Sequence, residues 1–467
     1  MNCIYIGQKG GFWVFQALEK QLESKLILPG NPLYDEKRKV WNGAIDKYPK
    51  AIAVCQSEKD VALAVQFAKK NHLHISIKGG GHHVAGIATC NDGLMIDISN
   101  MNKVTVDEEK KIAIVEGGAT LGDVDSETQK HGLAVPTGTV SKTGIAGLAL
   151  NGGLGYLRGK YGLTCDNIIG ARIVTANVEL IEVNNENYPD LLWAIRGGGG
   201  NFGVVTKFIF QLHPVGPEVL GLDIMYNYHD AKQILLKSQQ YLNQAPDEVS
   251  FNIMLTQLPP VPFLPEVLHH KKVVILTGMY AGDPKQGEKM IQPLRELAKP
   301  IVDNTAVLPY VELQKKLDPM VPEQAPVYGT SLYFQDLLEE HIDTLIRLID
   351  NAPAPTYIVQ LWGLNGQINQ VPADATAFAI RDAKYALLLD IMGMGIEEPI
   401  CQQWIQHVYE TLLPYSYKGA SYLNGIGLSE KVTKSSFQEN YQKLLEIKKK
   451  YDPYNLFRHN HNINPNE

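Results

Sequence analysis

The sequence predicts an α+β protein in two parts, on three observations. Glycines cluster between residues 78 and 203, where short β-rich segments alternate with helical patterns. From about His213-Pro214 onward, longer strand-like stretches alternate with amphipathic helices. Hydrophobic residues make up 45% of the 467 residues and charged residues 20%, the balance of a globular protein with ample core.

The glycine-rich part is typical of a mixed α/β unit. A helix is expected from Lys59 to Asn71, where apolar residues recur at helical spacing. Strands are expected at His74–Ile77, Leu94–Ile98, Ile112–Val115 and Ile173–Thr175. The glycines gather at Gly79–Gly81, Gly117-Gly118, Gly144–Gly155 and Gly197–Gly200. Such clusters indicate backbone that approaches something closely, because side chains would prevent the approach.

The later part predicts an antiparallel sheet with helices packed on it. Its strands are expected at Leu220–Tyr226, Phe251–Thr256, Val273–Tyr280, Gly329–Phe334, Tyr357–Trp362 and Tyr385–Ile391. Its helices are expected at Asp230–Asn243, Lys285–Leu297, Leu337–Asp350 and Pro399–Leu412, with proline-rich connectors such as Ala352–Pro355. A charged helix, Ser436–Lys450, and a turn-rich tail follow.

Composition argues against several classes of protein. Forty-three basic and fifty acidic residues give a net charge of −7, which argues against a nucleic-acid partner. The sequence contains no run of about eighteen apolar residues, so no membrane-spanning helix is predicted. The apolar stretch Gly11 to Phe15 is too short for a signal peptide. Five scattered cysteines without a C-x-x-C pair indicate reduced thiols in a cytoplasmic protein: Cys3, Cys55, Cys90, Cys165 and Cys401.

One apparent nucleotide motif does not have the right context. Gly198–Gly203 satisfies G-x-G-x-x-G, but a dinucleotide fingerprint needs a strand before it and a helix after it. Here a helix, Asp190–Ile195, is expected before it and a strand, Val204–Phe210, after it. The order is reversed, so we reject a Rossmann site.

Histidines crowd into one short stretch: His72, His74, His82 and His83. On a strand, His72 and His74 would share one face at ligand-like spacing. Only Cys90 and Asp92, on a following loop, could complete a coordination set. A metal site is therefore one hypothesis, and surface or strand-end histidines are the alternative.

His82 stands in a different context. The strand Ile75–Lys78 runs directly into Gly79–Gly81 and then His82. Three glycines after a strand leave bare N–H groups that can cradle a pyrophosphate, although a simple turn explains them equally well. A histidine at the end of such a loop would lie beside the rest of a bound cofactor.

A second set of glycine motifs favours a cofactor. Its segments are Pro136–Thr139, Gly144–Gly147, Asn151–Tyr156, Lys160–Leu163 and Asp166–Ile169. So many glycines would undermine an ordinary core helix, whereas they suit backbone that lines a long planar ligand.

Together these motifs resemble the covalent-flavin oxidases of the vanillyl-alcohol oxidase superfamily. The similar branch is the berberine-bridge-enzyme-like one, which includes bacterial hydroxynicotine oxidases. The resemblance runs from about residue 45 to 215 and resumes at Tyr451–Arg458, with Asn460 and Asn462. Asp190–Thr206, and Ala375–Phe378 followed by Arg381, support it.

The resemblance implies an α+β fold with a PCMH-type FAD-binding domain of two α/β subdomains, plus an α+β substrate domain with an antiparallel sheet. It divides the chain into an N-terminal segment (1–44), the FAD-binding domain (45–215), the substrate-binding domain (216–430) and a C-terminal berberine-bridge-like segment (431–467) that returns to the FAD domain. FAD would lie extended between the two subdomains, with its isoalloxazine facing the substrate domain.

The resemblance also assigns residues to FAD. By position, His82 matches the histidine that bonds covalently to the flavin 8-methyl carbon. Val140 stands where some relatives carry a second, cysteinyl link, and Cys165 does not match that position, so a single histidyl link is expected. The other implied FAD-binding residues are Lys78, Gly79, Gly80, Gly81, His83, Gly86, Thr137, Gly138, Thr139, Ser141, Gly144, Ile145, Gly147, Gly152, Gly153, Tyr156, Asn167, Val174, Asn460 and Asn462.

Two departures from the family pattern bear on the chemistry. Gly425 replaces a tyrosine base that many relatives place after the asparagine of Tyr-x-Asn-Tyr, and Ile380 replaces a histidine found before the Arg381 position. The pocket is therefore expected to be poor in acid/base groups. This favours oxidation of a C–N bond or an oxidative rearrangement, since an alcohol must lose a proton as its hydride departs. Oxidation of a carbohydrate or another alcohol is the alternative.

A few residues of the second part are candidates for the active site. Tyr422 is the candidate catalytic residue, and Trp362, Tyr328 and Arg381 are the candidate substrate-binding residues. Burial in the core is the alternative for the aromatic residues. For Arg381, the alternatives are an anion of the substrate or a nearby acid such as Asp382.

The predicted function is an FAD-dependent oxidase. A small organic substrate would pass a hydride to covalently bound FAD, and dioxygen would reoxidise the flavin to give hydrogen peroxide. The alternatives are a flavin dehydrogenase that uses another acceptor, a flavin-binding structural or coat-type protein with little activity, and a metal-binding protein that uses the histidine cluster.

Overall fold

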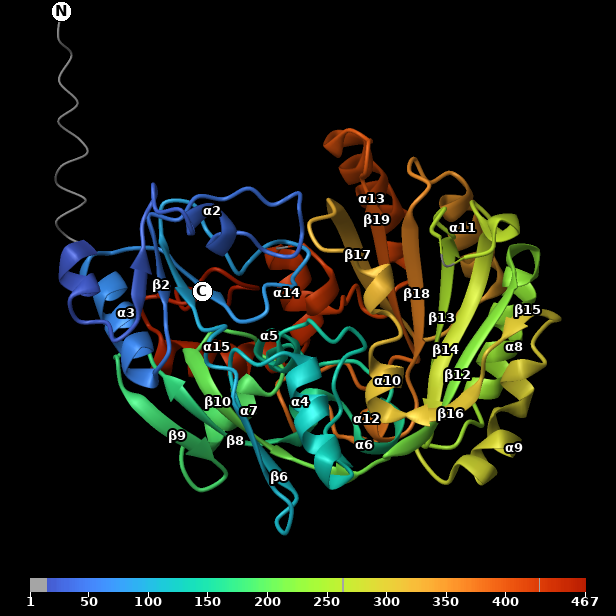
Figure 1. Ribbon diagram of the computed structural model, residues 1–467, viewed down its shortest axis with the longest axis horizontal. Coiled ribbons are helices and arrows are strands. Elements are labelled where there is room, and N and C mark those ends of the chain that lie inside the picture. The colour runs from blue at the N-terminus through green and yellow to red at the C-terminus, as the bar shows by residue number, and fades with distance from the viewer. Residues whose placement is uncertain (1–14, 263, 428) are drawn as a thin grey trace, which may run out of the picture.

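The structure, a computed structural model, describes residues 15–262, 264–427 and 429–467. Cys3 and nearly all of the apolar stretch Gly11 to Phe15 lie outside the described residues. Three β-sheets form the frame, and Figure 1 shows two smaller sheets in one half of the molecule and a large sheet in the other.

The first sheet holds the strand that leads to the His82 loop. Its order is β1-β2-β4-β3, and β2, β4 and β3 run parallel while β1 is antiparallel to β2. Helix α3 (Glu58–Lys70) crosses between β2 and β3 and begins at Ser57, whose side chain accepts a hydrogen bond from the Asp60 N–H. The strands are β1 (Lys25–Ile27), β2 (Ala51–Val54), β3 (Ile75–Lys78) and β4 (Leu94–Asp97).

The second sheet is antiparallel, with order β5-β6-β10-β8-β9. Its strands are β5 (Val104–Asp107), β6 (Ile112–Glu116), β8 (Ile168–Val174), β9 (Leu180–Asn184) and β10 (Val204–Gln211). Its connections contain the helices α4 (Leu121–Thr128), α5 (Ile145–Leu150), α6 (Arg158–Tyr161) and α7 (Pro189–Ile195). The short strands β7 (Leu133–Ala134) and β11 (His213–Pro214) pair beside it.

The third sheet is large and antiparallel, as the sequence predicts for the second part. Its order is β15-β12-β14-β13-β18-β19-β17, with β16 also paired to β12, so β17 is an edge strand. Figure 1 shows α8, α9 and α11 on its outer side, away from the two small sheets. The strands are β12 (Glu218–Asn227), β13 (Val249–Gln257), β14 (Lys272–Tyr280), β15 (Pro300–Asp303), β16 (Ala306–Pro309), β17 (Val327–Phe334), β18 (Tyr357–Gly363) and β19 (Tyr385–Met392).

The two faces of this sheet bury different clusters. Leu387, Leu389 and Ile391 of β19 pack with the helices α8 (Ala231–Leu242), α9 (Pro284–Arg295), α11 (Glu339–Asp350) and α13 (Glu398–Leu412). The opposite face contributes Trp362 and Ala386 to a cluster shared with the second sheet. Short helices α2 (Tyr34–Lys37), α10 (Tyr310–Gln314) and α12 (Gln367–Gln370) lie in connections. This contact between sheets is where a cavity forms.

Two local predictions were wrong. The expected helix Ser436–Lys450 is two helices, α14 (Glu430–Phe437) and α15 (Asn440–Tyr451), because Gln438 between them has φ 49°. His72 lies in a turn with φ 53°, and β3 begins only at Ile75, so His72 and His74 do not share a strand face. Among the described residues, no helix is long and apolar enough to cross a membrane.

Candidate cofactor and active site

A cavity of about 340 Å³ lies where the three sheets meet. Its walls come from the loop after β3, the region around α5, the start of β10, the inner face of β18 and β19, the segment 422–425 and the tail after α15. The chain therefore gathers the glycine motifs and the second part's sheet around one space.

Glycines shape this cavity in two ways. A side chain on Gly80 would collide with the backbone of Gly144, and one on Gly144 with the backbone of Gly80, so the two glycine loops can touch only without side chains. Gly147 differs, since a Cβ built there would meet no atom within 4 Å. Because Gly147 also lines the cavity, its missing side chain leaves room for a ligand.

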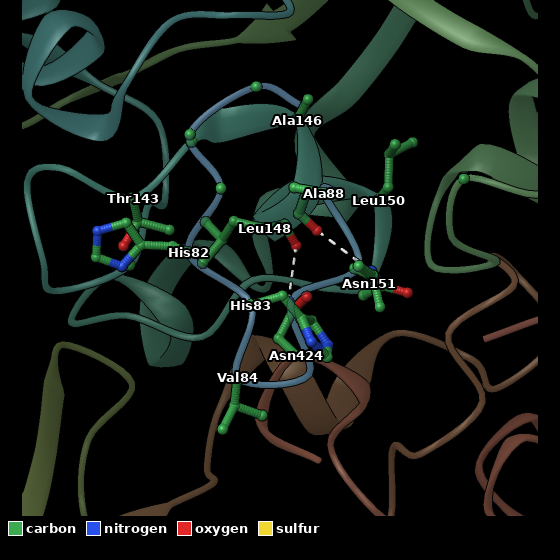
Figure 2. A pocket seen from close by; sticks show the side chains of 18 of the residues that line it. His82, His83, Val84, Ala88, Thr143, Ala146, Leu148, Leu150, Asn151 and Asn424 are labelled. Carbon is green, nitrogen blue, oxygen red and sulfur yellow. Dashed lines mark hydrogen bonds between the residues drawn. The ribbon is translucent and has the colours of Figure 1, made fainter. Parts of the chain in front are cut away.

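The neighbouring histidines of the β3 loop have different environments. Figure 2 shows the side chain of His82 directed away from that of His83. The His82 ring stacks on Trp41, with ring centroids 5.1 Å apart, and within the described chain its ring nitrogens make no hydrogen bond. Burial lowers the pKa of His82 to about 4, so its imidazole is neutral at physiological pH.

His83 is held in place instead. Its Nε2 donates to the Leu423 carbonyl at 2.9 Å, and its Nδ1 accepts from the Ala85 N–H at 3.1 Å. Asn424 next to Leu423 donates to the Leu148 carbonyl at 3.1 Å, which links the same segment to α5 (Figure 2). Of the two histidines, His82 is thus the one with ring nitrogens available to a ligand.

His461 offers the cavity a hydrogen-bond acceptor. Only 2% of the residue is exposed, and its Nε2 bonds the Leu423 carbonyl at 2.8 Å. Burial lowers its pKa to about 3, so the ring is neutral and the proton must sit on Nε2. Its Nδ1 is consequently a lone-pair acceptor, and it has no partner among the described residues.

Four more buried polar atoms at the cavity also lack partners in the described chain. Asn151 Oδ1 and Asn460 Oδ1 are acceptors, and Trp41 Nε1 and Trp362 Nε1 are donors. The amide of Asn460 is fixed because its Nδ2 donates to the Gly200 carbonyl at 3.0 Å. FAD carries hydroxyl and N–H donors together with carbonyl and ring-nitrogen acceptors, so these residues fit it.

The structure brings many of the sequence-predicted residues to this cavity. The predicted FAD-binding residues among its lining are His82, Gly79, Gly80, Gly81, His83, Gly138, Thr139, Gly144, Gly147 and Asn460. Trp362 and Tyr422 line it as well. Residues not singled out from the sequence include Trp41, Thr143, Gln360, Asp390, His459 and His461.

Other predicted FAD-binding residues lie outside the lining, and several of them have structural partners. Lys78 Nζ donates to the carbonyls of Lys37 and Lys39 at 3.0 and 2.8 Å. Ser141 bonds the carboxylate of Asp318. Ile145 and Val174 are buried in the core, and Thr137 and Asn167 bond inside the protein. Gly86, Gly152, Gly153, Tyr156 and Asn462 are likewise absent from the lining.

Two substrate-binding candidates are also elsewhere. Arg381 is 2% exposed and forms a bidentate ion pair with Asp166, at 2.8 and 2.6 Å. The acid that pairs with it is therefore Asp166 and not Asp382, and its guanidinium is not available to a substrate anion. Tyr328 lines a different cavity.

Tyr422 has an oriented hydroxyl. Its oxygen accepts from the Leu154 N–H and from Asn424 Nδ2, both at 3.1 Å. Burial raises the pKa of Tyr422, while these hydrogen bonds act in the opposite direction. The neutral hydroxyl has its oxygen occupied, so its hydrogen is the group left to point at a ligand.

Asp390 is the acid that reasoning from the sequence missed. It lies on β19 on the face opposite Leu389 and Ile391, lines the cavity, and has no hydrogen-bond or ion-pair partner in the described chain. Burial raises its pKa to about 7. The sequence feature that could have identified Asp390 is that it is the single charged residue in the apolar strand Tyr385–Met392. The cavity is thus richer in acid/base groups than Gly425 and Ile380 suggested.

Packing accounts for Gly425 and Ile380, the two residues that depart from the family pattern. Gly425 lines the cavity, and a Cβ there would lie 3.2 Å from Leu388 Cδ2, so a larger side chain would need a different Leu388. Ile380 is buried in the core and is absent from the lining. Val140 lines the cavity, whereas the described cysteines Cys55, Cys90, Cys165 and Cys401 are buried outside it.

The histidine cluster is not arranged as a metal site in the described part of the chain, which holds no group of three or more His, Cys, Asp or Glu suited to a metal ion. His74 Nε2 instead bonds His459 Nδ1 at 2.8 Å, and His459 Nε2 bonds the Thr89 carbonyl at 2.9 Å. Within the cluster, His74 therefore pairs with a histidine of the tail.

Comparison with known proteins agrees with this geometry. Residues 49–184 match the family model of the FAD binding domain, and residues 421–464 match that described as berberine and berberine like. The chain is 32% identical to an FAD-linked oxidoreductase of Dictyostelium discoideum over 452 residues, 96% of each chain.

Two further similarities cover nearly the whole chain. It is 30% identical to (R)-6-hydroxynicotine oxidase of Paenarthrobacter nicotinovorans, over 96% of this chain and 98% of that one. The crystal structure of 6-hydroxy-D-nicotine oxidase from Arthrobacter nicotinovorans superposes with a TM-score of 0.84 at 27% identity, covering 95% of this chain and 98% of that one. The predicted resemblance and fold class are confirmed.

Proposed function

This chain belongs to the FAD-linked oxidoreductases with a berberine-like C-terminal segment, and we propose that it is an oxidase with covalently bound FAD. A small organic substrate loses a hydride to FAD, dioxygen accepts the electrons, and hydrogen peroxide is released. Residues 45–215 with 431–467 form the FAD-binding unit in this proposal, and 216–430 the substrate-binding unit. The oxidised carbon bears a hydroxyl or amino group.

The observation that carries the proposal is Asp390 in the cavity wall. Its pKa of about 7 means that it exchanges a proton readily near neutral pH, which is what a general base requires. An alcohol or an ammonium group must lose a proton as the hydride departs. Asp390 takes that proton, and a dedicated tyrosine at position 425 is not needed.

Two neighbours orient the substrate. Asn252 donates to Gln360 Oε1 at 2.8 Å, which leaves the amide NH₂ of Gln360 for the cavity. The Tyr422 hydroxyl, with its oxygen occupied by two N–H donors, donates its hydrogen to the substrate. Holding the reacting atom among Asp390, Gln360 and Tyr422 lowers the barrier to reaction by fixing the orientation of that atom.

His82 holds the cofactor. FAD supplies the hydride acceptor when it is bound. The neutral His82 ring, stacked on Trp41 and without a hydrogen-bond partner in the described chain, has a free nitrogen lone pair for a bond to the flavin 8-methyl carbon. The acceptors His461 Nδ1, Asn151 Oδ1 and Asn460 Oδ1, which lack partners in the described chain, would accept hydrogen bonds from donors of FAD.

The first experiment is the visible spectrum of the purified protein before and after precipitation with trichloroacetic acid. Flavin absorption that stays in the pellet supports covalent FAD, and flavin in the supernatant refutes the His82 bond. The protein is then incubated with a panel of primary alcohols and amines while peroxide is measured. Substrate-dependent flavin bleaching without peroxide, but with reduction of an added quinone, would identify a dehydrogenase instead.

A further inference from the structure

A second cavity of about 480 Å³ opens beside the first one. One wall is the start of the edge strand β17, from Val327 to Thr330, and another is one face of α13, with Glu398, Gln402 and Gln406. Because much of the α13 wall is exposed, this space is an open cleft. We call it the α13 cleft.

Only a thin partition separates the α13 cleft from the first cavity, which we call the FAD cavity. Val84 lines both, and in Figure 2 it points away from Ala146 at the far end of the FAD cavity. Gly425 lines the cavity, and the next residue, Ile426, lines the cleft. Gly329 of the cleft wall contacts the Asp390 carboxylate so closely that a Cβ on Gly329 would collide with it. The acid of the first cavity is thus one residue away from the second.

The edge of β17 presents unpaired backbone to the cleft. Asn42 bonds both the N–H and the C=O of Val327, and Tyr333 bonds Ala420 and Tyr417, so both residues face away from β19. Since strand residues alternate, Gly329 has the same orientation. Its N–H and C=O have no partner in the described chain, which gives the cleft a donor and an acceptor.

The charged side chains that line the two spaces are acidic. Neither lining contains Lys or Arg, whereas Asp390 lines the cavity and Glu398 the cleft. Glu398 accepts a hydrogen bond from Gln402 at 2.6 Å and has no ion-pair partner among the described residues. An anionic ligand would find no counter-charge here, whereas a cation would find an unpaired carboxylate.

We propose that the α13 cleft is a second binding site that holds the distal, cationic end of an elongated substrate. The oxidised carbon of the same molecule lies beside Asp390, and its linking atoms pass between Val84 and Gly329, so binding requires the Val84 side chain to turn away from this partition. The distal ammonium pairs with Glu398 and donates to the Gly329 carbonyl. This inference rests on the proposed oxidase function and specifies its substrate class, which is an amine or alcohol with a second, cationic group.

The test measures binding separately from turnover. Butane-, hexane-, octane- and decanediamine, and the monoamines of the same lengths, are titrated by calorimetry into holoenzyme whose flavin has first been reduced with dithionite under nitrogen, so that no amine is oxidised during the titration. The long diamines are expected to bind roughly fivefold more tightly than the matched monoamines, as suits an ion pair with an exposed carboxylate. Butanediamine, which is too short to span both spaces, should show no advantage.

Two variants and one control assign that advantage to the cleft. Glu398→Gln should remove it, and Gln402→Lys should make the long diamines bind worse than the monoamines. Glu397→Gln removes a neighbouring charge from the same helix terminus but lies outside the cleft lining, so it should leave the advantage intact. All three positions are exposed, Glu398 and Gln402 on α13 and Glu397 just before it, so the fold should tolerate the changes.

The outcomes separate this inference from the proposed function. If amines bleach the flavin but long diamines show no advantage, or Glu398→Gln does not change it, the second site is refuted and the oxidase stands. If no diamine binds, the cationic substrate class is refuted. Peroxide production from the alcohol panel then decides the oxidase function on its own.

Discussion

His83 and His461 donate to the same carbonyl oxygen, that of Leu423, at 2.9 and 2.8 Å. One histidine comes from the loop after β3 and the other from the tail after α15, so this carbonyl ties two distant parts of the chain to the segment that carries Tyr422 and Asn424. The shared acceptor fixes the tautomer of both rings, because each must carry its proton on Nε2. Of these two rings, only that of His461 keeps an acceptor nitrogen without a partner in the described chain.

Replacing His461 should weaken FAD binding without unfolding the protein. In a His82→Ala background, where FAD is not covalent, adding His461→Phe should raise the Kd for FAD by roughly tenfold, since one buried hydrogen bond is lost. His461→Gln, which can keep both hydrogen bonds, should cost less. Flavin fluorescence quenching measures the Kd. An equal Kd in all three proteins would show that Nδ1 does not contact FAD.

His82→Ala should make the flavin extractable by acid. The neutral His82 ring is the one with a free nitrogen at the cavity, whereas both nitrogens of His83 are engaged. The matched control is His83→Gln, which should retain covalent flavin in the acid pellet. Covalent flavin that persists in His82→Ala would mean that another residue carries the bond.

Asp390→Asn should lower the rate of flavin reduction at least a hundredfold, as the loss of a general base does. Because the pKa of Asp390 is about 7, wild-type kcat/KM should rise as pH increases through 7 and level off above it. The rising limb should vanish in the variant. Stopped-flow absorbance under anaerobic conditions gives both. A limb that survives in Asp390→Asn would assign the titration to a different group.

The buried acid Asp125 should make stability fall with pH. It is 1% exposed, accepts from Thr137 and Gln314, and burial raises its pKa to about 7, above the unfolded value near 4. The native state therefore binds the proton more tightly, so its contribution is complete below about pH 4 and is lost as pH rises to about 7. Asp125→Asn should gain on the order of 1–3 kcal/mol relative to wild type at pH 8, and nothing at pH 4. Urea denaturation at both pH values measures it, and an equal difference at each would contradict it.

Arg381 should matter for stability and not for substrate affinity. Arg381→Met leaves the Asp166 carboxylate buried without its ion pair, which costs about 3–5 kcal/mol. Asp166→Asn should cost a similar amount, and the double variant less than the sum of both. The control is a substitution of Arg196, because its guanidinium bonds only backbone carbonyls in the same region and pairs with no carboxylate of the described chain. A raised KM with unchanged stability would restore the substrate-anion role.

The local patterns of the sequence were sufficient to predict most of the strands and helices. Strands such as β19 and helices such as α3 follow directly from runs of apolar residues and caps. The strand Ile75–Lys78 leading into three glycines drew attention to His82, but only the family resemblance assigned that residue to FAD. The close approach of Gly80 to Gly144 was not predicted, because the sequence indicates bare backbone on both loops but not that the two loops meet.

Tertiary structure alone decided which polar residues reach the cavity. The partner of Arg381, Asp166, is 215 positions away along the chain, and no local pattern could choose it over the adjacent Asp382. Asp390 faces the cavity because the helices cover the other face of β19, a choice set by how the large sheet packs. The Leu423 carbonyl meets His83 and His461 only after the tail folds back. Each of these depends on contacts between distant segments, whereas sequence patterns report the conformation of neighbouring residues.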